Sequence, residues 1–113
     1  MSRIHSLKNR EFQEVYAFRH SFANRSLILY VKPNGTDDIR IGISASRKIG
    51  NSVVRHRVVR VIRECCRLHM DELKKGLDIV IVARPTAVEQ GLFEMEKAFF
   101  HAGRKQNIFK ESK

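Results

Sequence analysis

The sequence is poor in the residues that build metal sites and disulfide frameworks. Its 113 residues include two cysteines, two prolines and no tryptophan. Cys65 and Cys66 are adjacent, and no C-x-x-C or Cys/His spacing accompanies them. The five histidines also lack the spacing of metal ligands. We therefore expect no metal site in the protein, and we interpret both cysteines as small apolar side chains in a reducing compartment.

Long apolar runs are also missing. No stretch approaches the roughly 20 apolar residues that a membrane-spanning helix needs, and the N-terminal segment lacks the apolar centre of a signal peptide. These absences predict a cytoplasmic protein without a membrane partner. Hydrophobic residues make up 42% of the chain, which is too many for a mainly disordered basic protein. The length predicts one domain over residues 1–113, ending in a flexible basic tail over 104–113.

Acidic residues are scarce relative to basic ones. The chain has 12 Asp and Glu against 22 Lys and Arg, a formal net charge of +10 and a pI near 10.2. Such an excess attracts a polyanion, which means nucleic acid or an anionic membrane surface. The distribution of the positive charges along the chain decides between these two partners.

The periodicity of apolar residues predicts three elements in the first half of the chain. An i, i+3, i+4 pattern predicts a helix from about residue 8 to residue 19. Alternating apolar residues predict strands over 27–32 and 39–46. Turn-forming residues fill 33–38, so we interpret the two strands as an antiparallel hairpin.

The second half of the chain predicts a long helix followed by a buried strand. Asn51 or Ser52 can cap a helix that runs to about Lys75 and stops at Gly76. The continuous apolar run over 78–83 is typical of a central strand that is covered on both faces.

A last helix is expected to begin at a capping box over 86–89 and to end near Gly103. We expect Phe93, Phe99 and Phe100 to lie mainly in the core. The order helix, strand, strand, helix, strand, helix predicts an α+β fold, a small α/β sandwich whose mixed sheet carries about three helices.

Positive charge is concentrated in one segment. Between positions 46 and 67 there are seven basic residues and one acidic residue, Glu64, which gives a net charge of +6. On a helix, the apolar residues of this segment gather on one face and the basic residues on the opposite face. The basic face carries His56, Arg60, Arg63 and Arg67, with Arg55 and Arg57 at its borders.

This basic face is unlike an ordinary solvated helix face. Exposed faces usually mix signs, because i, i+4 pairs of opposite charge stabilise a helix, whereas neighbouring like charges cost stability unless an anion neutralises them. All but one of the seven basic residues are arginine, whose planar fork of donors suits phosphate and base edges. Arg47, Lys48, Gly50 and Asn51 form a basic turn before the helix, where free N–H groups can meet an anion. We favour a functional face over a merely solvated one.

At these residues the sequence resembles a known family. Residues 46–64 closely resemble the signature of the bacterial ribonuclease P protein subunit; they read Ser-Arg-Lys-Ile-Gly-Asn-Ser-Val-Val-Arg-His-Arg-Val-Val-Arg-Val-Ile-Arg-Glu. The likeness extends to Lys-Asn-Arg-Glu-Phe at 8–12, to Leu-Tyr-Val at 29–31, to Asp-Ile-Val-Ile-Val-Ala-Arg at 78–84 and to the final helix.

The resemblance implies a ribonucleoprotein endoribonuclease. Family members bind a large catalytic RNA and assist it in removing the 5′ leader from precursor tRNA, while the RNA performs the hydrolysis with magnesium ions. The implied partners are therefore ribonuclease P RNA and precursor tRNA, with magnesium bound mainly by the RNA, no catalytic residue in the protein and no protein partner required. The resemblance also implies a left-handed β-α-β crossover, although right-handed crossovers are the strong default.

The resemblance assigns binding of the catalytic RNA to the basic helix and the loop before it. Arg55, His56 and Arg57 fall on the family's Arg-Asn-Arg motif, where His56 replaces the usual asparagine. Val59 stands where many members have lysine, which removes one phosphate contact. The expected RNA-binding residues are Arg47, Lys48, Asn51, Arg55, His56, Arg57, Arg60, Arg63 and Arg67.

Three aromatic residues, Phe12, Tyr16 and Tyr30, match the family's cleft between the first helix and the sheet, where leader nucleotides lie. Single-stranded RNA stacks on aromatic rings in positive grooves, which contributes about 1–3 kcal/mol per base. Without the resemblance, core packing is the better explanation of Phe12 and Tyr16. The alternation of Tyr30 with Lys32 places Tyr30 at a surface or a cleft.

Other functions remain open on the residues alone. They are an RNA-binding protein without hydrolysis, a DNA-binding protein that inserts the arginine helix into a major groove, and a membrane-surface helix. The membrane alternative is the weakest, because the apolar face is rich in valine and cysteine rather than in aromatic residues. A protein nuclease with two metals needs converging carboxylates, and the acidic residues here are scattered between a turn and helices.

Overall fold

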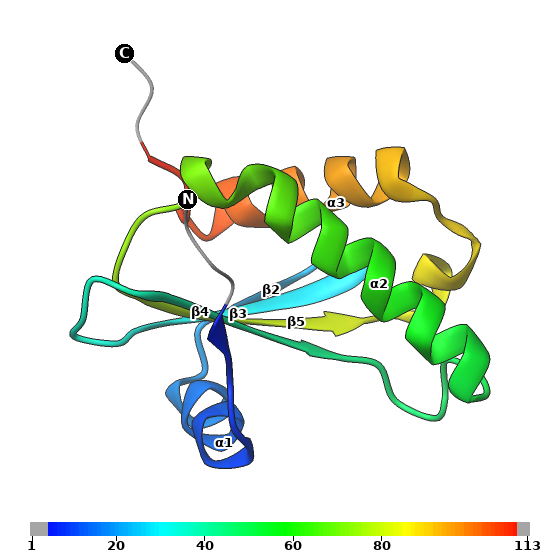
Figure 1. Cartoon of the computed structure of the whole chain (residues 1–113), viewed down its shortest axis with the longest axis horizontal. Coiled ribbons are helices and arrows are strands. Elements are labelled where there is room, and N and C mark those ends of the chain that lie inside the picture. Colours follow the sequence, from blue (N-terminus) through cyan, green and yellow to red (C-terminus); the bar gives the residue numbers. More distant parts are fainter. Residues whose placement is uncertain (1–4, 111–113) are drawn as a thin grey trace.

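Three layers make up the fold that the computed structural model describes over residues 5–110. A sheet lies in the middle, with α2 and α3 over one face and α1 over the other (Figure 1). The α+β fold with a mixed sheet and three α-helices in the described chain is confirmed. In chain order the elements are β1 (His5–Ser6), α1 (Asn9–Phe18), β2 (Ser21–Ala23), β3 (Leu27–Pro33), β4 (Ile39–Ser44), α2 (Ser52–His69), the 3-10 helix η1 (Met70–Glu72), β5 (Leu77–Ala83), the 3-10 helix η2 (Pro85–Glu89) and α3 (Leu92–Lys105).

The sheet has the strand order β1-β4-β5-β3-β2, so β5 is central. β5 pairs in parallel with β4 and antiparallel with β3. The predicted hairpin between β3 and β4 is therefore wrong, because β5 lies between these two strands. The prediction of a covered central strand is confirmed, since Ile79, Val80 and Ile81 are fully buried. A run that is apolar on both faces is best covered at the centre of a sheet.

The turn between β3 and β4 does not close a hairpin; it hydrogen-bonds to Gly76, the residue before β5. The Asn34 amide donates to the Gly76 carbonyl oxygen at 2.9 Å, and the Gly76 amide donates to the Asp38 carbonyl oxygen at 3.1 Å. Gly76 has a φ of +79°, and a Cβ there would lie 2.7 Å from the carbonyl oxygen of Thr36. Glycine is thus required by this turn and does not end α2, which stops earlier than expected, at His69.

α2 connects the parallel neighbours β4 and β5 by crossing one face of the sheet. In Figure 1, β4 lies nearer the viewer than β5, both strands run from left to right, and α2 lies above them. The β4-α2-β5 crossover is therefore left-handed, as the resemblance implied, and departs from the usual right-handed rule.

The two faces of the sheet carry separate apolar clusters. Leu27, Leu29 and Val31 of β3 belong to the large cluster that packs against α2 and α3. Tyr30, between them in sequence, lies on the opposite face beside a smaller cluster that includes Val15 of α1. Alternation along the strands thus separates a face under α2 and α3 from a face under α1.

α3 begins later than predicted. Residues 85–89 form η2, and the helix starts after Gly91, whose amide donates to the Glu94 carboxylate at 2.8 Å. Phe93, which we expected in the core, is 65% exposed, whereas Phe99 is buried as expected. No helix of the described chain has the length and the apolar content to cross a membrane.

The segment after Arg104 is folded where the sequence predicted a frayed tail. The side-chain amide of Gln106 donates to the Leu29 carbonyl oxygen at 3.1 Å, and Ile108 is fully buried. The tail prediction is therefore wrong up to residue 110, and residues 111–113 lie outside the described part of the chain. Composition misled here, because two apolar residues, Ile108 and Phe109, pack against the core and hold this largely polar segment in place.

Candidate nucleic-acid interface

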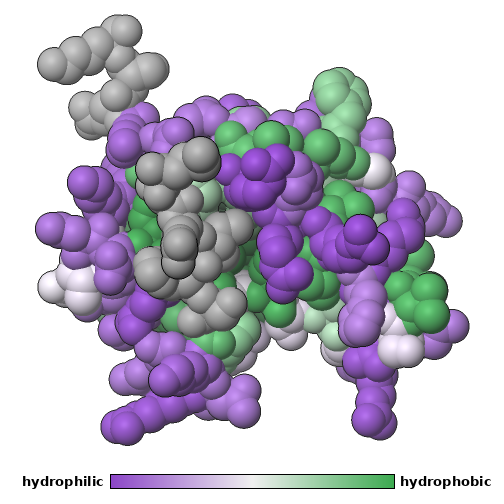
Figure 2. Space-filling view, in the orientation of Figure 1, coloured by the Kyte–Doolittle hydropathy of each residue, from purple (hydrophilic) through white to green (hydrophobic). Residues whose placement is uncertain are grey.

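α2 has a buried face and a cationic face, as the sequence predicted. Asn51 caps the helix, its side-chain oxygen accepting a hydrogen bond of 3.0 Å from the Val54 amide. Val58 and Ile62 are buried in the large cluster. Figure 2 shows hydrophilic side chains along the diagonal course of α2. The exposed basic and histidine residues of α2 are His56, Arg57, Arg60, Arg63 and Arg67.

The cations of this face differ in how their charge is compensated. Arg67 forms an ion pair with Glu64, with Nε donating to Oε2 at 3.0 Å, and this hydrogen bonding holds the pKa of Glu64 below its ordinary value. Arg60 and Arg63 form no ion pair with any residue between 5 and 110. Their positive charges are therefore left for an external anion.

The loop before α2 is anchored by one apolar side chain and presents two cations. Ile49 is buried in the large cluster, whereas Arg47 and Lys48 are exposed. Gly50 has a φ of +156°, and a Cβ there would lie 3.0 Å from the side chain of Val54. The loop therefore lies close against the first turn of α2, which keeps both cations near the helix N-terminus.

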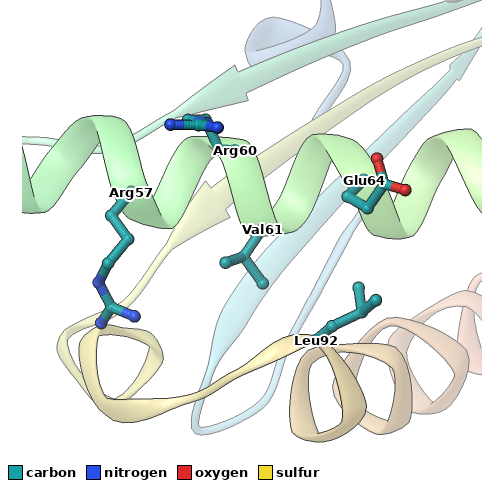
Figure 3. Close-up of a pocket in the computed structure, with 5 residues that line it drawn as sticks. All are labelled: Arg57, Arg60, Val61, Glu64 and Leu92. Carbon is teal, nitrogen blue, oxygen red and sulfur yellow. The ribbon is translucent and has the colours of Figure 1, made fainter.

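Two hollows lie on either side of Arg60. Beside one of them, Arg57 reaches from α2 toward η2, where it donates to the carbonyl oxygen of Val88. At the border of the face, Arg55 is half-buried, and its Nε has no partner among the described residues. The first hollow, of about 360 Å³, is lined by Arg57, Arg60, Val61, Glu64 and Leu92 (Figure 3). The second, of about 410 Å³, is lined by His56, Val59, Arg60 and Arg63.

Phe12, Tyr16 and Tyr30 meet on the opposite face of the sheet. The rings of Tyr16 and Tyr30 contact edge to face, with centroids 4.9 Å apart and planes at 82°, and the Phe12 centroid lies 6.3 Å from that of Tyr16. All three side chains are half-buried beside the cluster that contains Val15. Burial raises the pKa of the Tyr16 phenol. The structure thus brings together the three aromatic residues of the expected leader cleft and leaves part of each accessible.

Two residues of β4 lie beside this aromatic cluster and were not singled out as site residues from the sequence. A Cβ on Gly42 would overlap the ring of Phe12, so glycine lets this ring lie directly on the strand. The Ser44 side chain partly opposes the burial that raises the pKa of the Tyr16 phenol. Alternation along β4 already places both residues on the face away from the large core, and this is the signal that could have found them.

Six carboxylates of the described chain contact its own cations, histidine or amides. Between residues 5 and 110, no three His, Cys, Asp or Glu side chains gather as metal ligands would. Glu11 and Asp78 pair with Arg40, Glu64 pairs with Arg67, Glu72 and Glu96 contact His69, and Glu94 accepts from Gly91. The described residues therefore do not fit a magnesium ion held by the protein alone.

The chain is similar to proteins of one family over nearly its whole length. A family model described as ribonuclease P matches residues 1–106. The ribonuclease P protein components of Alkaliphilus oremlandii and Lachnoclostridium phytofermentans are 43% identical over 101 residues and 45% identical over 108 residues; these alignments cover 89% of this chain and 89% of the first protein, and 95% of this chain and 93% of the second. The solved structure of the Staphylococcus aureus RNase P protein matches with a TM-score of 0.86 at 32% identity and covers 96% of this chain and 100% of that one. The chain therefore belongs to the bacterial ribonuclease P protein family. It is the protein subunit that associates with ribonuclease P RNA in the ribonuclease P holoenzyme, an endoribonuclease.

Proposed function

We propose that this subunit binds the catalytic RNA with the exposed face of α2 and the loop before it, and binds the 5′ leader of precursor tRNA in the aromatic cleft under α1. In this role it assists the magnesium-dependent endonucleolytic removal of the leader. The observation that carries the proposal is the one-sided array of cations on α2.

The state of the α2 cations supports an RNA partner. Arg60 and Arg63 lie one turn apart without ion-pair partners in the described chain, an arrangement that costs stability in the free protein. A phosphate chain removes this repulsion and accepts from the forked donors of both side chains. A merely solvated face would gain by placing a carboxylate at one of these positions.

The aromatic cleft supports a single-stranded ligand. Its rings are half-buried, so the protein fixes their positions while part of each ring surface stays accessible. Lys32 follows Tyr30 on the same strand face at a spacing of two residues, which adds positive charge near the rings. Rings within a positive groove hold unpaired bases by stacking.

We assign the hydrolytic chemistry to the RNA subunit, with magnesium bound mainly by that RNA and without a protein partner. Support comes from the engagement of the protein's carboxylates. Asp78, which is 2% exposed, and Glu11 both bind Arg40, so neither is free to act as a general base. Glu94 holds the start of α3. The contacts of these three carboxylates stabilise the fold.

Reconstitution tests the proposal. Adding the protein to the matching catalytic RNA should allow precursor tRNA cleavage at a lower magnesium concentration than the RNA needs alone. The affinity for leader-bearing substrate should rise with it. An unchanged magnesium requirement together with an unchanged leader affinity would overturn the proposal. A preference for duplex DNA over precursor tRNA in competition would favour a DNA-binding protein instead.

A further inference from the structure

The groove between α2 and the start of α3 combines an apolar floor with charged walls (Figure 3). Val61 of α2 and Leu92 of α3 point toward each other, and both are half-buried. Arg57, Arg60 and Glu64 complete the lining; along α2, Arg57 and Arg60 lie on one side of Val61 and Glu64 on the other, with the Glu64 carboxylate turned away from Leu92. The groove is open, and its volume of about 360 Å³ exceeds what one water molecule needs many times over.

Glu64 is the unusual member of this lining. It is the one acidic residue among the seven basic residues of positions 46–67. Both of its oxygens accept from Arg67, Oε2 from Nε at 3.0 Å and Oε1 from Nη2, so the carboxylate is held in one orientation. A carboxylate has about four lone-pair sites, and two of them remain after this pairing. The hydrogen bonds from Arg67 lower the pKa of Glu64, so the group is ionised and acts only as an acceptor.

The chemistry of the lining selects its occupant. A phosphate group is attracted to Arg57 and Arg60 but repelled by Glu64, so phosphates belong at the arginine end only. An apolar peptide side chain would cover Val61 and Leu92 but would leave the charged walls without partners. A flat ring that stacks on the floor and presents N–H donors satisfies Glu64, while its own phosphate satisfies the arginines.

We propose that this groove receives one unpaired nucleobase that carries an amino group, which donates to Glu64 while the adjacent phosphates bind Arg57 and Arg60. The inference rests on the proposed function, because it places part of the RNA on α2. Adenine, cytosine and guanine have such an amino group. Uracil has none, and its single N3–H donor lies between two carbonyl oxygens that the ionised carboxylate repels. Arg67 is a positioning residue for Glu64.

Short oligouridylates with a single central adenosine, cytidine or guanosine test the groove. Fluorescence anisotropy would give their dissociation constants with the full-length protein, against the all-uridine strand. The wild-type protein should bind at least one amino-bearing strand more tightly than the all-uridine strand by about fivefold or more. In Glu64→Ala, which removes the acceptor, this preference should disappear. Equal binding of all four strands by the wild-type protein would overturn the proposal.

Charge alone predicts the opposite result, which makes the variant informative. Removing one negative charge near an RNA site strengthens the binding of every strand, whereas removing a base-reading group weakens only the amino-bearing strands. Asp37→Ala, in the exposed turn between β3 and β4, is the charge-matched control and should keep the preference. If Glu64→Ala also keeps it, Glu64 does not read a base.

The reconstitution test separates this inference from the proposed function. A protein that lowers the magnesium requirement of the catalytic RNA but shows no base preference keeps the proposed function and loses the groove. A protein that changes neither the magnesium requirement nor the leader affinity in reconstitution would overturn the proposed function, whatever the oligonucleotides show. The urea unfolding midpoint of Glu64→Ala verifies that the variant is folded before binding is compared.

Discussion

The guanidinium of Arg40 on β4 makes two hydrogen bonds of 2.7 Å with the carboxylate of Asp78, its register partner on β5. Glu11 of α1 contacts the third nitrogen of the same guanidinium. The hydrogen bonds from Arg40 to Asp78 are the main reason that the pKa of Arg40 is raised, despite partial burial that opposes it. The Arg40 side chain thus links α1 to the parallel strands β4 and β5.

Asp78→Ala should therefore destabilise the protein strongly. Asp78 is 2% exposed, and its removal leaves the Arg40 guanidinium without its main partner. We expect a loss of about 3 kcal/mol in the free energy of unfolding, at the lower end for buried pairs because Arg40 keeps Glu11. Urea unfolding measures this loss. Asp37→Ala, in the exposed turn, should change the same quantity by less than about 0.5 kcal/mol.

The unpaired arginines of α2 should dominate the salt dependence of RNA binding. Arg60→Ala and Arg63→Ala should each weaken binding to the catalytic RNA and reduce the slope of log K against log salt by roughly 0.7–0.9. Arg67→Ala should reduce the slope less, because its charge is already paired with Glu64. Filter binding over a salt series measures the slopes. Arg10→Ala, on the far face, serves as the control, and unchanged slopes for both Arg60 and Arg63 would contradict the assignment.

Tyr16→Ala should discriminate between substrates. We expect leader-bearing precursor tRNA to lose about 1–3 kcal/mol of binding free energy, the contribution of one stacked base, while mature tRNA loses little. Tyr16→Phe keeps the ring and should keep most of the affinity. The holoenzyme's dissociation constants for the two tRNAs give the comparison. Phe18→Ala, at an exposed position of the same helix, is the matched control; equal losses for both tRNAs would count against the cleft.

His69 should make stability depend on pH. It lies at the end of α2, with Nε2 2.6 Å from Glu96 and Nδ1 in contact with Glu72, and the edge of its ring meets Phe100. Burial disfavours the imidazolium, but the hydrogen bonds to Glu96 and Glu72 outweigh it, so the pKa of His69 is raised. The stabilisation is complete below the unfolded value of about 6.5 and is lost as pH rises through the higher folded value.

The difference in unfolding free energy between wild type and His69→Gln should therefore be larger near pH 6 than near pH 9. Urea unfolding across this range measures the difference. His56→Gln, an exposed change on the same helix, provides the comparison. A His69→Gln difference that stays constant across the range would show that the ion pairs contribute nothing through charge.

The two cysteines should be inert in the folded protein. Burial raises the pKa of the Cys65 thiol to about 12, and it also raises that of Cys66. The thiolate is the reactive form, so a thiol reagent near pH 8 should label neither residue until urea unfolds the chain. Fast labelling of the folded protein would mean that α2 separates from the sheet.

Periodicity predicted α2 and its two faces over most of its length, but not its end, which lies at His69 instead of near Lys75, nor the exposure of Leu68. The apolar spacing fixes which residues face the sheet, and the cations occupy what remains. The assignment of Phe93 to the core was wrong, because Phe93 lies in the first turn of α3 on the side away from the buried Met95 and Phe99. Helix boundaries depend on local hydrogen bonds such as that from Gly91 to Glu94, for which the chain offers competing candidates.

Strand pairing was not predictable from neighbouring residues. The turn formers after β3 suggested a hairpin, but β5 pairs with β3 and β4 on its two edges. The aromatic cleft depends on the same topology, since Tyr16 and Tyr30 come from a helix and a strand and meet only through the fold. Here the family resemblance supplied what local patterns do not contain.

The central position of β5 has a consequence for synthesis. β3 and β4 emerge from the ribosome first, and neither can complete its pairing until Leu77–Ala83 follow. A nascent chain of about 76 residues therefore carries two unpaired strand edges, the kind of surface that recruits chaperones or aggregates. The last third of the polypeptide thus joins the β1-β4 and β3-β2 pairs into one sheet, and a chain released before that point lacks the strand that connects them.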